Sequence, residues 1–502
     1  MKLVTASEMM NADRSMAENY DYPTLLLMEH AAQAVFSEMQ KRNLCSKRIA
    51  VVCGKGNNGG DGYALARMLF ESGADVKIIN AFSMMPKGMD AEVNYRICRK
   101  TGVRFAEASY IDEADVIVDA LFGIGMNNRL NDFCGEIITR INNSDAYVVA
   151  IDLPSGAYGD YCVQQNTCVK ADLTVTFAAM KNALVFFPSA LYAGEVVCRD
   201  IGIIDECMDS DKFIIDKPLV SGLLPKRRAD GHKGTFGKLV CIAGSPGLSG
   251  AAYMCSEAAL RSGCGLVKLY VPESISEIME QKTTEVMTYA LPSGGDGLIS
   301  SASTEITAAS LACDAVLFGC GIGRNDEVSD ALQALITTTN VPVIIDADGL
   351  FALSKNLDIL EEKTCPVILT PHLGEMARLS GDTQEELAEK PLLCASRFAV
   401  KNGVTLVMKS ARTVVASPDG RVFVNIMGNS GLAKGGSGDC LAGIIASLVA
   451  QGADALSAAV CGVAVHALAG DISKDKKGSE YSFTPTDIID NLGFAFSEFE
   501  EL

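Results

Sequence analysis

Two stretches that are far apart in the chain each have the form of a glycine loop ending in an aspartate. Residues 57–62 read Asn-Asn-Gly-Gly-Asp-Gly, and residues 429–439 end in Gly-Gly-Ser-Gly-Asp. Glycine lets the backbone approach a ligand closely and point several N–H groups at an anion. The sequence therefore predicts two phosphate-binding sites, one on each of two domains.

The second loop runs into an apolar stretch at residues 440–446, which predicts a buried helix. The partial positive charge of a helix N-terminus favours phosphate. A carboxylate at that place repels phosphate, so we interpret Asp439 as a base that takes a proton from a hydroxyl held beside the phosphate. The alternative is that Asp439 only caps the helix.

Length and composition indicate a two-domain protein of the cytoplasm. A chain of 502 residues exceeds the size at which a single core stops growing. Its net charge of −19 disfavours nucleic acid and anionic membranes as partners, and it keeps a cytosolic enzyme soluble. The 17 cysteines form no C-x-x-C pair, which is typical of reduced core residues. We find neither a signal peptide nor a run of 18 apolar residues, and we expect no membrane span.

The first half alternates short β-branched runs with helical patterns. Strands are predicted at 48–53, 75–81, 114–120, 146–151 and 172–177, and helices at 62–72 and 134–142. This alternation predicts a parallel sheet with helices on both faces. In such sheets, ligands bind beyond the carboxyl ends of the strands.

Three motifs fall at those strand ends, namely residues 57–62, 119–125 and 152–156. Their side chains offer oxygen ligands, so Asn58, Asp119 and Ser155 together are suited to a hard cation. The alternative is that Asp119 and Asp152 cap loops by accepting backbone N–H groups.

In this order, the three motifs resemble the NAD(P)H-hydrate epimerase domain, and the resemblance covers residues 1–212. It implies a Rossmann-like fold that interconverts the R and S forms of hydrated NADH and NADPH. It also implies potassium on Asn58, Asp119 and Ser155, and catalysis by Asp152 at the reacting ring. The other substrate-binding residues that it implies are Asn57, Asn58, Gly59, Gly60, Asp61, Gly123, Ile124, Gly125, Met126, Asn127, Asn128 and Arg129. Relatives more often have Gly and Pro before Lys181, which leaves the role of this lysine open.

A junction precedes a second α/β pattern. It is acidic at residues 205–211 and basic at 225–228. Strands are predicted at 238–243, 266–271, 314–319, 342–346, 367–370 and 405–409, and an apolar helix at 455–468. Motifs again follow the strands, at residues 244–250, 319–323, 346–349 and 370–375. Within the last motif His372 and Glu375 form a possible metal pair, but we favour His372 as a polar contact to substrate because no H-E-x-x-H motif is present.

These loops resemble the ribokinase-type superfamily and, more narrowly, its NAD(P)H-hydrate dehydratase branch, over residues 225–502. Residues 232–237 and 370–375 are the distinguishing stretches. The resemblance implies ADP or ATP as phosphate donor, with ADP as the expected co-substrate together with Mg²⁺. It implies that Asp439 is catalytic and that Gly323, His372 and Asp439 contact the hydrate. The nucleotide-binding residues that it implies are Lys409, Ser410, Ala411, Arg412, Thr413, Asn429, Ser430, Gly431, Leu432, Ala433, Lys434, Gly435, Gly436, Ser437 and Gly438.

The sequence is therefore interpreted as a bifunctional cytosolic repair enzyme of hydrated NADH and NADPH, and a homo-oligomer is expected. Two alternatives stay open at this stage. In one, the second domain is a kinase of a vitamin or sugar alcohol that uses the same Asp439. In the other, the first domain is a nucleotide-binding module without catalysis.

Overall fold

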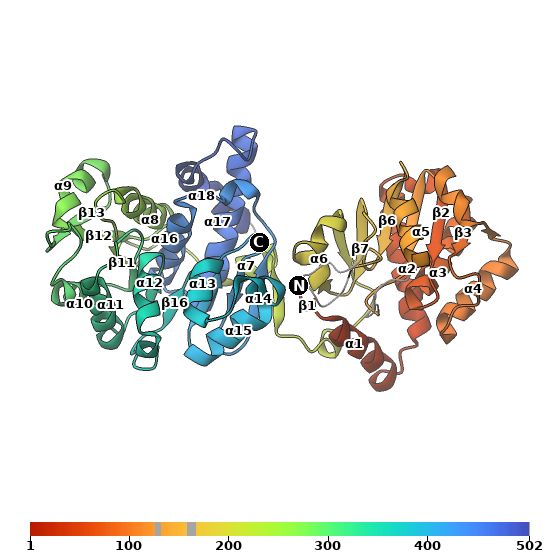
Figure 1. Ribbon diagram of the computed structural model, residues 1–502, viewed down its shortest axis with the longest axis horizontal. Helices are drawn as coiled ribbons and strands as arrows, with labels where there is room; N and C mark the ends of the chain where they lie inside the picture. Colours follow the sequence, from red (N-terminus) through yellow and green to blue (C-terminus); the bar gives the residue numbers. More distant parts are fainter. Residues whose placement is uncertain (126–131, 158–166, 501–502) are drawn as a thin grey trace. The chain divides into compact units, whose positions relative to one another are not determined.

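The computed structural model describes residues 1–125, 132–157 and 167–500 (Figure 1). The chain divides into two compact units, Met1–Lys212 and Phe213–Leu502. Each unit is an α/β fold built on its own sheet, so the predicted fold class is confirmed.

Seven parallel strands form the sheet of the first unit, in the order β4-β3-β2-β5-β6-β7-β9. Their bounds are β2 (Arg48–Cys53), β3 (Asp75–Asn80), β4 (Arg104–Phe105), β5 (Val116–Ala120), β6 (Tyr147–Ile151), β7 (Leu173–Phe177) and β9 (Glu195–Arg199). The five predicted strands correspond to β2, β3, β5, β6 and β7. The edge strands β4 and β9 were not predicted.

Helices cover both faces of this sheet because successive strand residues point to opposite sides. In β2, Ile49 and Val51 pack into the cluster that contains α2 and α3, whereas Ala50 and Val52 pack into the cluster that contains α5. The helices are α1 (Ala6–Asn19), α2 (Thr24–Lys41), α3 (Asn57–Glu71), α4 (Met89–Thr101), α5 (Asp132–Asn142) and α6 (Asn182–Val185), with short 3₁₀ turns η1 (Leu44–Ser46), η2 (Ala108–Glu113), η3 (Ser189–Tyr192) and η4 (Asp205–Cys207).

The position of α1 is fixed by a separate pair of short parallel strands. Residues Leu3–Val4 (β1) pair with Met180–Lys181 (β8), which sets Val4 opposite Lys181. Thr5 then caps α1 through a capping box with Glu8. The start of α1 is thereby held next to Lys181, the residue that precedes α6.

Residues 57–62 were predicted as a loop and instead form the start of α3, whose N-cap is Gly56. The glycines allow close packing there. A β-carbon on Gly59 would lie 2.2 Å from the Gly54 carbonyl oxygen, and one on Gly62 would lie 2.6 Å from the Ala120 side chain. The glycines therefore let the first turns of a helix lie directly on the strand ends.

The second unit contains a ten-stranded sheet in the order β10-β19-β18-β17-β16-β15-β14-β11-β12-β13. Strands β11 to β17 run parallel, while β18 and β19 form an antiparallel extension. Their bounds are β10 (Lys212–Ile215), β11 (Lys238–Ile242), β12 (Leu266–Pro272), β13 (Met287–Leu291), β14 (Ala315–Phe318), β15 (Val343–Ile345), β16 (Val367–Leu369), β17 (Thr405–Met408), β18 (Val414–Ala416) and β19 (Val422–Asn425).

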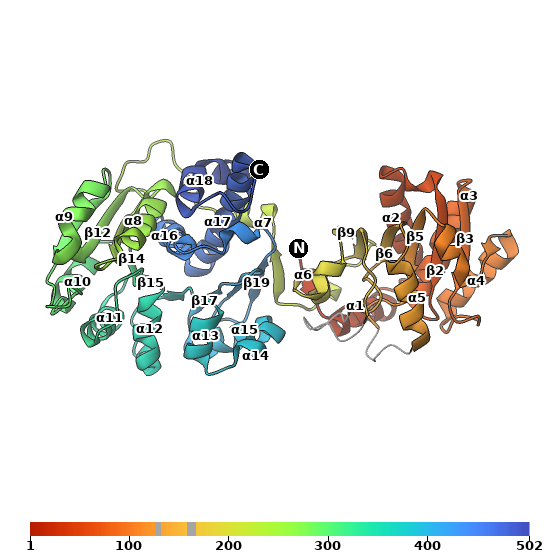
Figure 2. The same ribbon diagram turned by 45° about the horizontal axis from the view of Figure 1, so that its top comes forward.

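Figure 2 shows α8, α16, α17 and α18 on one side of this sheet and α11, α12, α13 and α15 on the other. The helices of the second unit are α7 (Lys217–Leu223), α8 (Ser249–Arg261), α9 (Glu273–Lys282), α10 (Ser303–Ser310), α11 (Asp326–Thr338), α12 (Asp348–Lys355), α13 (Leu373–Ser380), α14 (Gln384–Glu389), α15 (Pro391–Asn402), α16 (Ser437–Ala450), α17 (Ala455–Lys477) and α18 (Pro485–Glu500), with the turns η5 (Leu357–Leu360) and η6 (Ser430–Leu432).

Helix α17 is long and apolar enough to cross a bilayer by length and composition alone. Its 18-residue window has a mean hydropathy of 1.6, and 72% of that window is buried inside the protein. The helix packs against α16 and α18 within the core of the second unit. Burial of this kind is that of a core helix in a globular domain.

The second unit also includes β10 and α7, which lie in the stretch that sequence analysis treated as a junction. The Phe213 ring stacks on Phe423 with ring centroids 5.2 Å apart. Ile215 and Val220 are buried in the core of the unit. Strand β10 and helix α7 thus bury additional apolar side chains in the core of the second unit.

We expect each unit to fold alone, and the second to need β10 and α7. Fragment 225–502 should unfold at lower urea than fragment 213–502, with a free energy of unfolding lower by at least about 3 kcal/mol, because each buried Ile or Val contributes about 1.5–3 kcal/mol. Circular dichroism during urea titration measures the difference. Fragment 213–502 with Lys217→Ala is the control, since Lys217 is exposed. Equal stability of the two fragments would contradict the boundary.

Candidate active sites

In the first unit, the strand order reverses between β2 and β5, and their carboxyl ends open into a cavity of about 700 Å³. Such a switch point is where open α/β sheets bind ligands. The predicted site residues that line this cavity are Asn57, Asn58, Asp61, Gly123, Ile124, Gly125 and Asp152. Gly59 and Gly60 lie behind the lining, in the packed start of α3. Met126, Asn127, Asn128 and Arg129 lie outside the described residues.

Asp152 directly follows β6 and takes a left-handed backbone conformation, with φ of 66°. Its Oδ1 atom lies 2.9 Å from Lys181 Nζ and accepts a hydrogen bond of 3.0 Å from Thr176 Oγ1. Its Oδ2 atom points toward Gly123, where a β-carbon would lie only 3.3 Å away. One oxygen is therefore anchored, and the other faces the loop that lines the cavity.

Lys181 is almost completely buried, with 1% of its side chain exposed. Besides Asp152, its ammonium donates hydrogen bonds of 2.8 Å to Thr176 Oγ1 and to the Phe177 carbonyl. Three acceptors thus surround the ammonium. The role that sequence analysis left open is visible in the structure: Lys181 holds the Asp152 carboxylate in place.

Asp119 and Ser155 come together as predicted. Asp119 accepts hydrogen bonds from the Ser155 hydroxyl (2.6 Å), the Ser155 N–H (2.7 Å) and the Leu121 N–H. Burial raises the pKa of Asp119 to about 6, and the hydrogen bonds from Ser155 oppose the increase. Asn58 is not bonded to either residue. Its Oδ1 atom lies 3.2 Å from the position of a Gly123 β-carbon, beside Asp152.

In the second unit, α16 begins at Ser437, and its N-cap is Gly436 with φ of 96°. Asp439 is therefore the third residue of the helix, and no side chain caps this end. The alternative in which Asp439 serves as the helix cap is not what the structure shows. The residues from Cys440 to Ala450 are buried, as the apolar stretch predicted.

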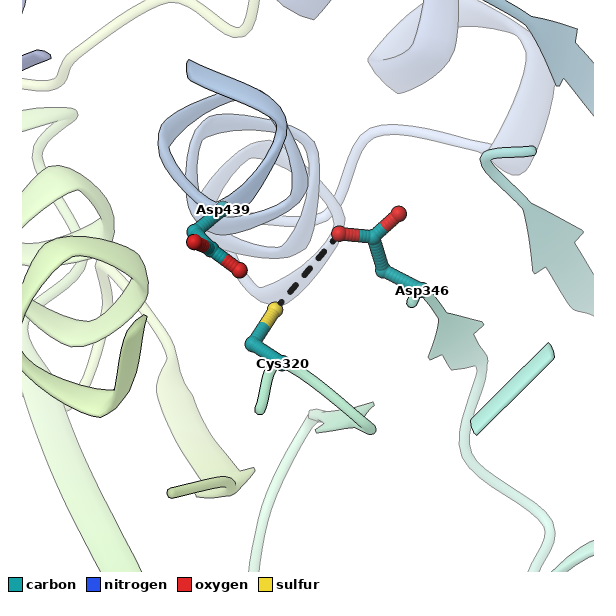
Figure 3. Close-up of side chains that lie close together, drawn as sticks. All are labelled: Cys320, Asp346 and Asp439. Carbon is teal, nitrogen blue, oxygen red and sulfur yellow. Dashed lines mark hydrogen bonds between the residues drawn. The ribbon is translucent and has the colours of Figure 1, made fainter. Parts of the chain in front are cut away.

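Figure 3 shows Asp439 beside two side chains that end neighbouring strands, Cys320 and Asp346. Cys320 donates a long hydrogen bond (3.7 Å) to Asp346 Oδ2, and the possible ligand atoms of the three lie within 4.8 Å of one another. Burial and the negative charge of Asp346 raise the pKa of Asp439 to about 7, while Cys320 and Lys409 act in the opposite direction.

Lys409 connects this cluster to the glycine loop. Its ammonium donates a 2.7 Å hydrogen bond to Asp346 Oδ1, which also accepts one from Thr370. A β-carbon on Gly438 would lie 3.0 Å from Lys409 Nζ. The structure therefore brings together Lys409, Gly438 and Asp439, which are predicted site residues from distant parts of the chain.

His372 lies next to Lys409 through an isolated parallel bridge. Its Nδ1 atom accepts hydrogen bonds from the N–H groups of Gly374 and Glu375 and thereby caps α13. The ring is 61% exposed, and Nε2 lies 3.4 Å from a Glu375 oxygen. Because Nδ1 is occupied by backbone N–H groups, Nε2 is the ring nitrogen that is open to a ligand.

Several predicted nucleotide residues use their side chains to hold the loop. Lys434 donates to the carbonyls of Glu480, Tyr481 and Phe483, and Ser437 shares a 3.1 Å hydrogen bond with buried His466. Other such contacts join Asn429 to Asp471, Ser430 to Glu480, Ser410 to the Arg412 carbonyl, Arg412 to the Ile426 carbonyl and Thr413 to the Ser410 carbonyl. Gly323, a predicted contact to the hydrate, donates its backbone N–H to Asp348. The remaining predicted residues, Ala411, Gly431, Leu432, Ala433 and Gly435, belong to the same two segments. In the second segment, the N–H groups of Gly431, Leu432, Ala433, Lys434 and Ser437 are already bonded within the loop. Those of Gly435, Gly436 and Gly438 make no bond to the described residues and can face an anion.

Two family models match the chain. The model described as NAD(P)H-hydrate dehydratase matches residues 239–493, and the model described as YjeF-related protein N-terminus matches residues 24–183. The chain is 37% identical to the bifunctional NAD(P)H-hydrate repair enzyme Nnr of Moorella thermoacetica, over 100% of this chain and 98% of the relative. The chain belongs to the family of bifunctional NAD(P)H-hydrate repair enzymes. Its identity to the Escherichia coli member is 31%, over 97% of this chain and 92% of the relative.

Solved structures of similar proteins, which cover 57–58% of this chain, agree with this family. The ADP/ATP-dependent NAD(P)H-hydrate dehydratase of Bacillus subtilis, co-crystallised with ATP and Mg²⁺, is 30% identical, with a TM-score of 0.50 over 57% of this chain and 99% of that chain. A ribokinase-like superfamily protein of Enterococcus faecalis is 27% identical, with a TM-score of 0.51 over 58% of this chain and 98% of that chain. The predicted ribokinase-like fold of the second unit is confirmed.

Among the side chains that line the first cavity, sequence analysis gave no role to Asp13, Lys55, Phe82 and Asp90. It noted Asp346 only as part of a motif and gave it no role. Asp346 had a usable signal, because it ends a strand in the same manner as Asp152. Asp13 had none, because it is one polar residue among many on α1.

We expect the contribution of Lys181 to the stability of the first unit to depend on the presence of the Asp152 carboxylate. Lys181→Met should lower the free energy of unfolding of fragment 1–212 by about 3 kcal/mol or more, because it leaves a buried carboxylate without its cation. In an Asp152→Asn background the same change should cost less than about 1 kcal/mol. Urea unfolding of the four proteins measures this coupling. Lys100→Met is the control, since Lys100 is exposed on α4, and an equal cost in both backgrounds would contradict the pairing.

Proposed function

We propose that this chain is a bifunctional repair enzyme that returns hydrated NADH and NADPH to their reduced forms. The first unit interconverts the R and S hydrates. The second unit phosphorylates the hydroxyl of the S hydrate at the expense of ADP and lets the phosphate leave. The observation that carries the proposal is the position of Asp439 in the first turn of α16, beneath a loop of glycine N–H groups, in a chain of this family.

The chemistry of the second unit follows from that position. Hydroxide is a poor leaving group and phosphate a good one, so dehydration becomes easy once the hydroxyl is phosphorylated. Gly435, Gly436 and Gly438 offer N–H groups to the transferred phosphate at a helix N-terminus. Asp439 takes the hydroxyl proton, because a buried carboxylate with a pKa near 7 is a competent base at neutral pH.

We propose ADP with Mg²⁺ as the co-substrate of the second unit, bound along residues 409–413 and 429–438. The B. subtilis relative that was crystallised with ATP and Mg²⁺ supports this choice of ligand class. The donor set fits in part. The Asp346 carboxylate suits Mg²⁺, which is usually held by one or two carboxylates and by substrate phosphates, whereas the Cys320 thiol does not, and Asp439 has to stay free to act as the base.

In the first unit we propose that Asp152 exchanges protons with the hydrated ring. Its free oxygen faces the cavity, while Lys181 and Thr176 hold the other. We also propose potassium near Asp119 and Ser155, whose buried carboxylate and hydroxyl oxygens fit a hard cation. A bound cation would compensate the charge of a carboxylate that burial otherwise disfavours.

We place the enzyme in the cytoplasm, because all cysteines of the described residues are free and most are buried. We also propose a homo-oligomer, and light scattering of the purified chain measures its mass.

Two substitutions should separate the activities. Asp439→Asn should abolish dehydration, keep ADP binding unchanged or tighter, and leave epimerisation intact, because it removes only the base of the second unit. Asp152→Asn should slow epimerisation at least about a hundredfold and leave dehydration of the S hydrate intact. Chromatography of both epimers, with absorbance of the restored NADH, measures the two rates. Asp490→Asn, at an exposed position of α18, is the control.

Near-normal dehydration by folded Asp439→Asn would contradict the proposal that Asp439 is the base. Normal epimerisation by Asp152→Asn would show that the carboxylate is not needed, and would leave the first unit as a binding module.

The dehydration rate should follow the ionisation of Asp439. This base acts in its ionised form, so kcat/KM should be level above about pH 7 and fall about tenfold per pH unit below it. Cys320→Ala should move the midpoint to higher pH, because the neighbouring Cys320 thiol lowers the pKa of Asp439. A pH series of initial rates measures both. An unchanged midpoint in Cys320→Ala would show that another group, such as the nucleotide phosphate, controls the profile.

A further inference from the structure

The cavity of the first unit is lined by three carboxylates that come from different elements. Asp13 lies on α1, Asp61 lies on α3, and Asp152 follows β6. Their bonding differs. Asp152 is paired with the buried Lys181 ammonium, whereas within the described part of the chain no hydrogen bond or ion pair reaches the Asp13 or Asp61 carboxylate. Two of the three acids are thus open to a ligand.

The position of Asp13 is built into the fold. The pairing of Val4 with Lys181 starts α1 next to the lysine, and the capping box fixes its first turn. Met9, Ala12 and Met16 are buried beneath the helix. Asp13 then faces the cavity together with Met9 and Met10, one turn before it.

The surroundings of Asp13 and Asp61 favour the protonated form of both carboxyl groups. Burial raises the pKa of Asp13 to about 6; Lys181 opposes this and Asp152 adds to it. Burial, together with the charges of Asp152 and Asp13, raises the pKa of Asp61 well above its usual range. The other charged groups that line the cavity are Lys55 and Asp90.

The proposed reaction of the first unit requires both an acid and a base, so the inference rests on that proposed function. Each ring double bond of a dihydronicotinamide adjoins nitrogen, and addition of water leaves the hydroxyl on a carbon bonded to that nitrogen. This hemiaminal inverts by opening. A base removes the hydroxyl proton, the C=O bond forms, the C–N bond breaks, and its electron pair takes a proton from an acid. Rotation and closure on the other face return both protons.

We propose that Asp13 is a catalytic residue of the epimerase, sharing with Asp61 the proton that is delivered to the ring nitrogen while Asp152 accepts the hydroxyl proton. Lys181 suits Asp152 to the role of base, because it holds one carboxylate oxygen in place and leaves the other toward the cavity. Among the described residues no cation pairs with Asp13 or Asp61, which suits these two carboxyl groups to the role of acid. The division of roles follows the general pattern in which neighbouring carboxyl groups are separated by their environments.

Full-length Asp13→Asn tests the proposal, with the R hydrate of NADH as substrate and without ADP or ATP, so that the second unit is silent. Chiral chromatography of the two epimers gives the rate. We expect kcat to fall at least about a hundredfold with KM near that of the wild type. The wild-type rate should also fall at high pH, as the acid loses its proton, and Asp13→Asn should lose or shift this decline. Glu18→Gln, exposed on the same helix, should behave as the wild type, and Asp13→Glu should recover part of the rate.

The outcomes separate the two claims. If the wild type does not epimerise the hydrate, the proposed function of the first unit fails. If the wild type does, and Asp13→Asn keeps its rate and pH profile, the role of Asp13 is overturned. A loss expressed only in KM, with the wild-type pH profile, also overturns it, because that result indicates a binding role. Should Asp13→Asn not fold by circular dichroism, Asp13→Ser is judged by the same criteria.

Discussion

The cost of burying a carboxylate governs both sites. An unpaired buried charge is expensive, and each unit meets this cost with a buried lysine. Lys181 holds Asp152, and Lys409 holds Asp346, at 2.9 and 2.7 Å. In each case a threonine hydroxyl also donates to the paired carboxylate. Each lysine therefore fixes the carboxylate that ends a strand in its site.

Both sites join an aspartate that follows a strand to one in the first turns of a helix. The strand-end members are Asp152 and Asp346, and the helix members are Asp61 and Asp439. A helix N-terminus favours a carboxylate by only about 0.3–1 kcal/mol, which is less than one pKa unit. Burial and the neighbouring charge prevail over that effect, since the pKa of Asp439 is raised to about 7. In the second unit, the helix member Asp439 is thus the carboxylate that can exchange a proton near neutral pH.

Much of this arrangement was readable in the sequence, because strand ends and glycine loops are local signals. The contact of Asp119 with Ser155, and the placement of Asp439 at the start of a buried helix, followed from such signals. Residues 57–62 were misread as a loop, because glycine runs normally break helices and only packing against the sheet explains their helical form. The position of Asp13 depends on the pairing of β1 with β8, which no local pattern encodes.

The two proposed reactions differ in what they ask of these acids, and the sites differ accordingly. Transfer of a phosphate to a hydroxyl needs one base, and beside Lys409 the paired Asp346 leaves Asp439 to serve alone. Opening a hemiaminal needs a base and an acid together, so the first site needs a proton donor besides Asp152. The first unit has an additional carboxylate, Asp13, on α1, a helix that packs on its core and is joined to Lys181 through β1 and β8. A pair of strand and helix acids thus lies at both proposed sites, and the proposed acid–base reaction is at the site that has a third carboxylate.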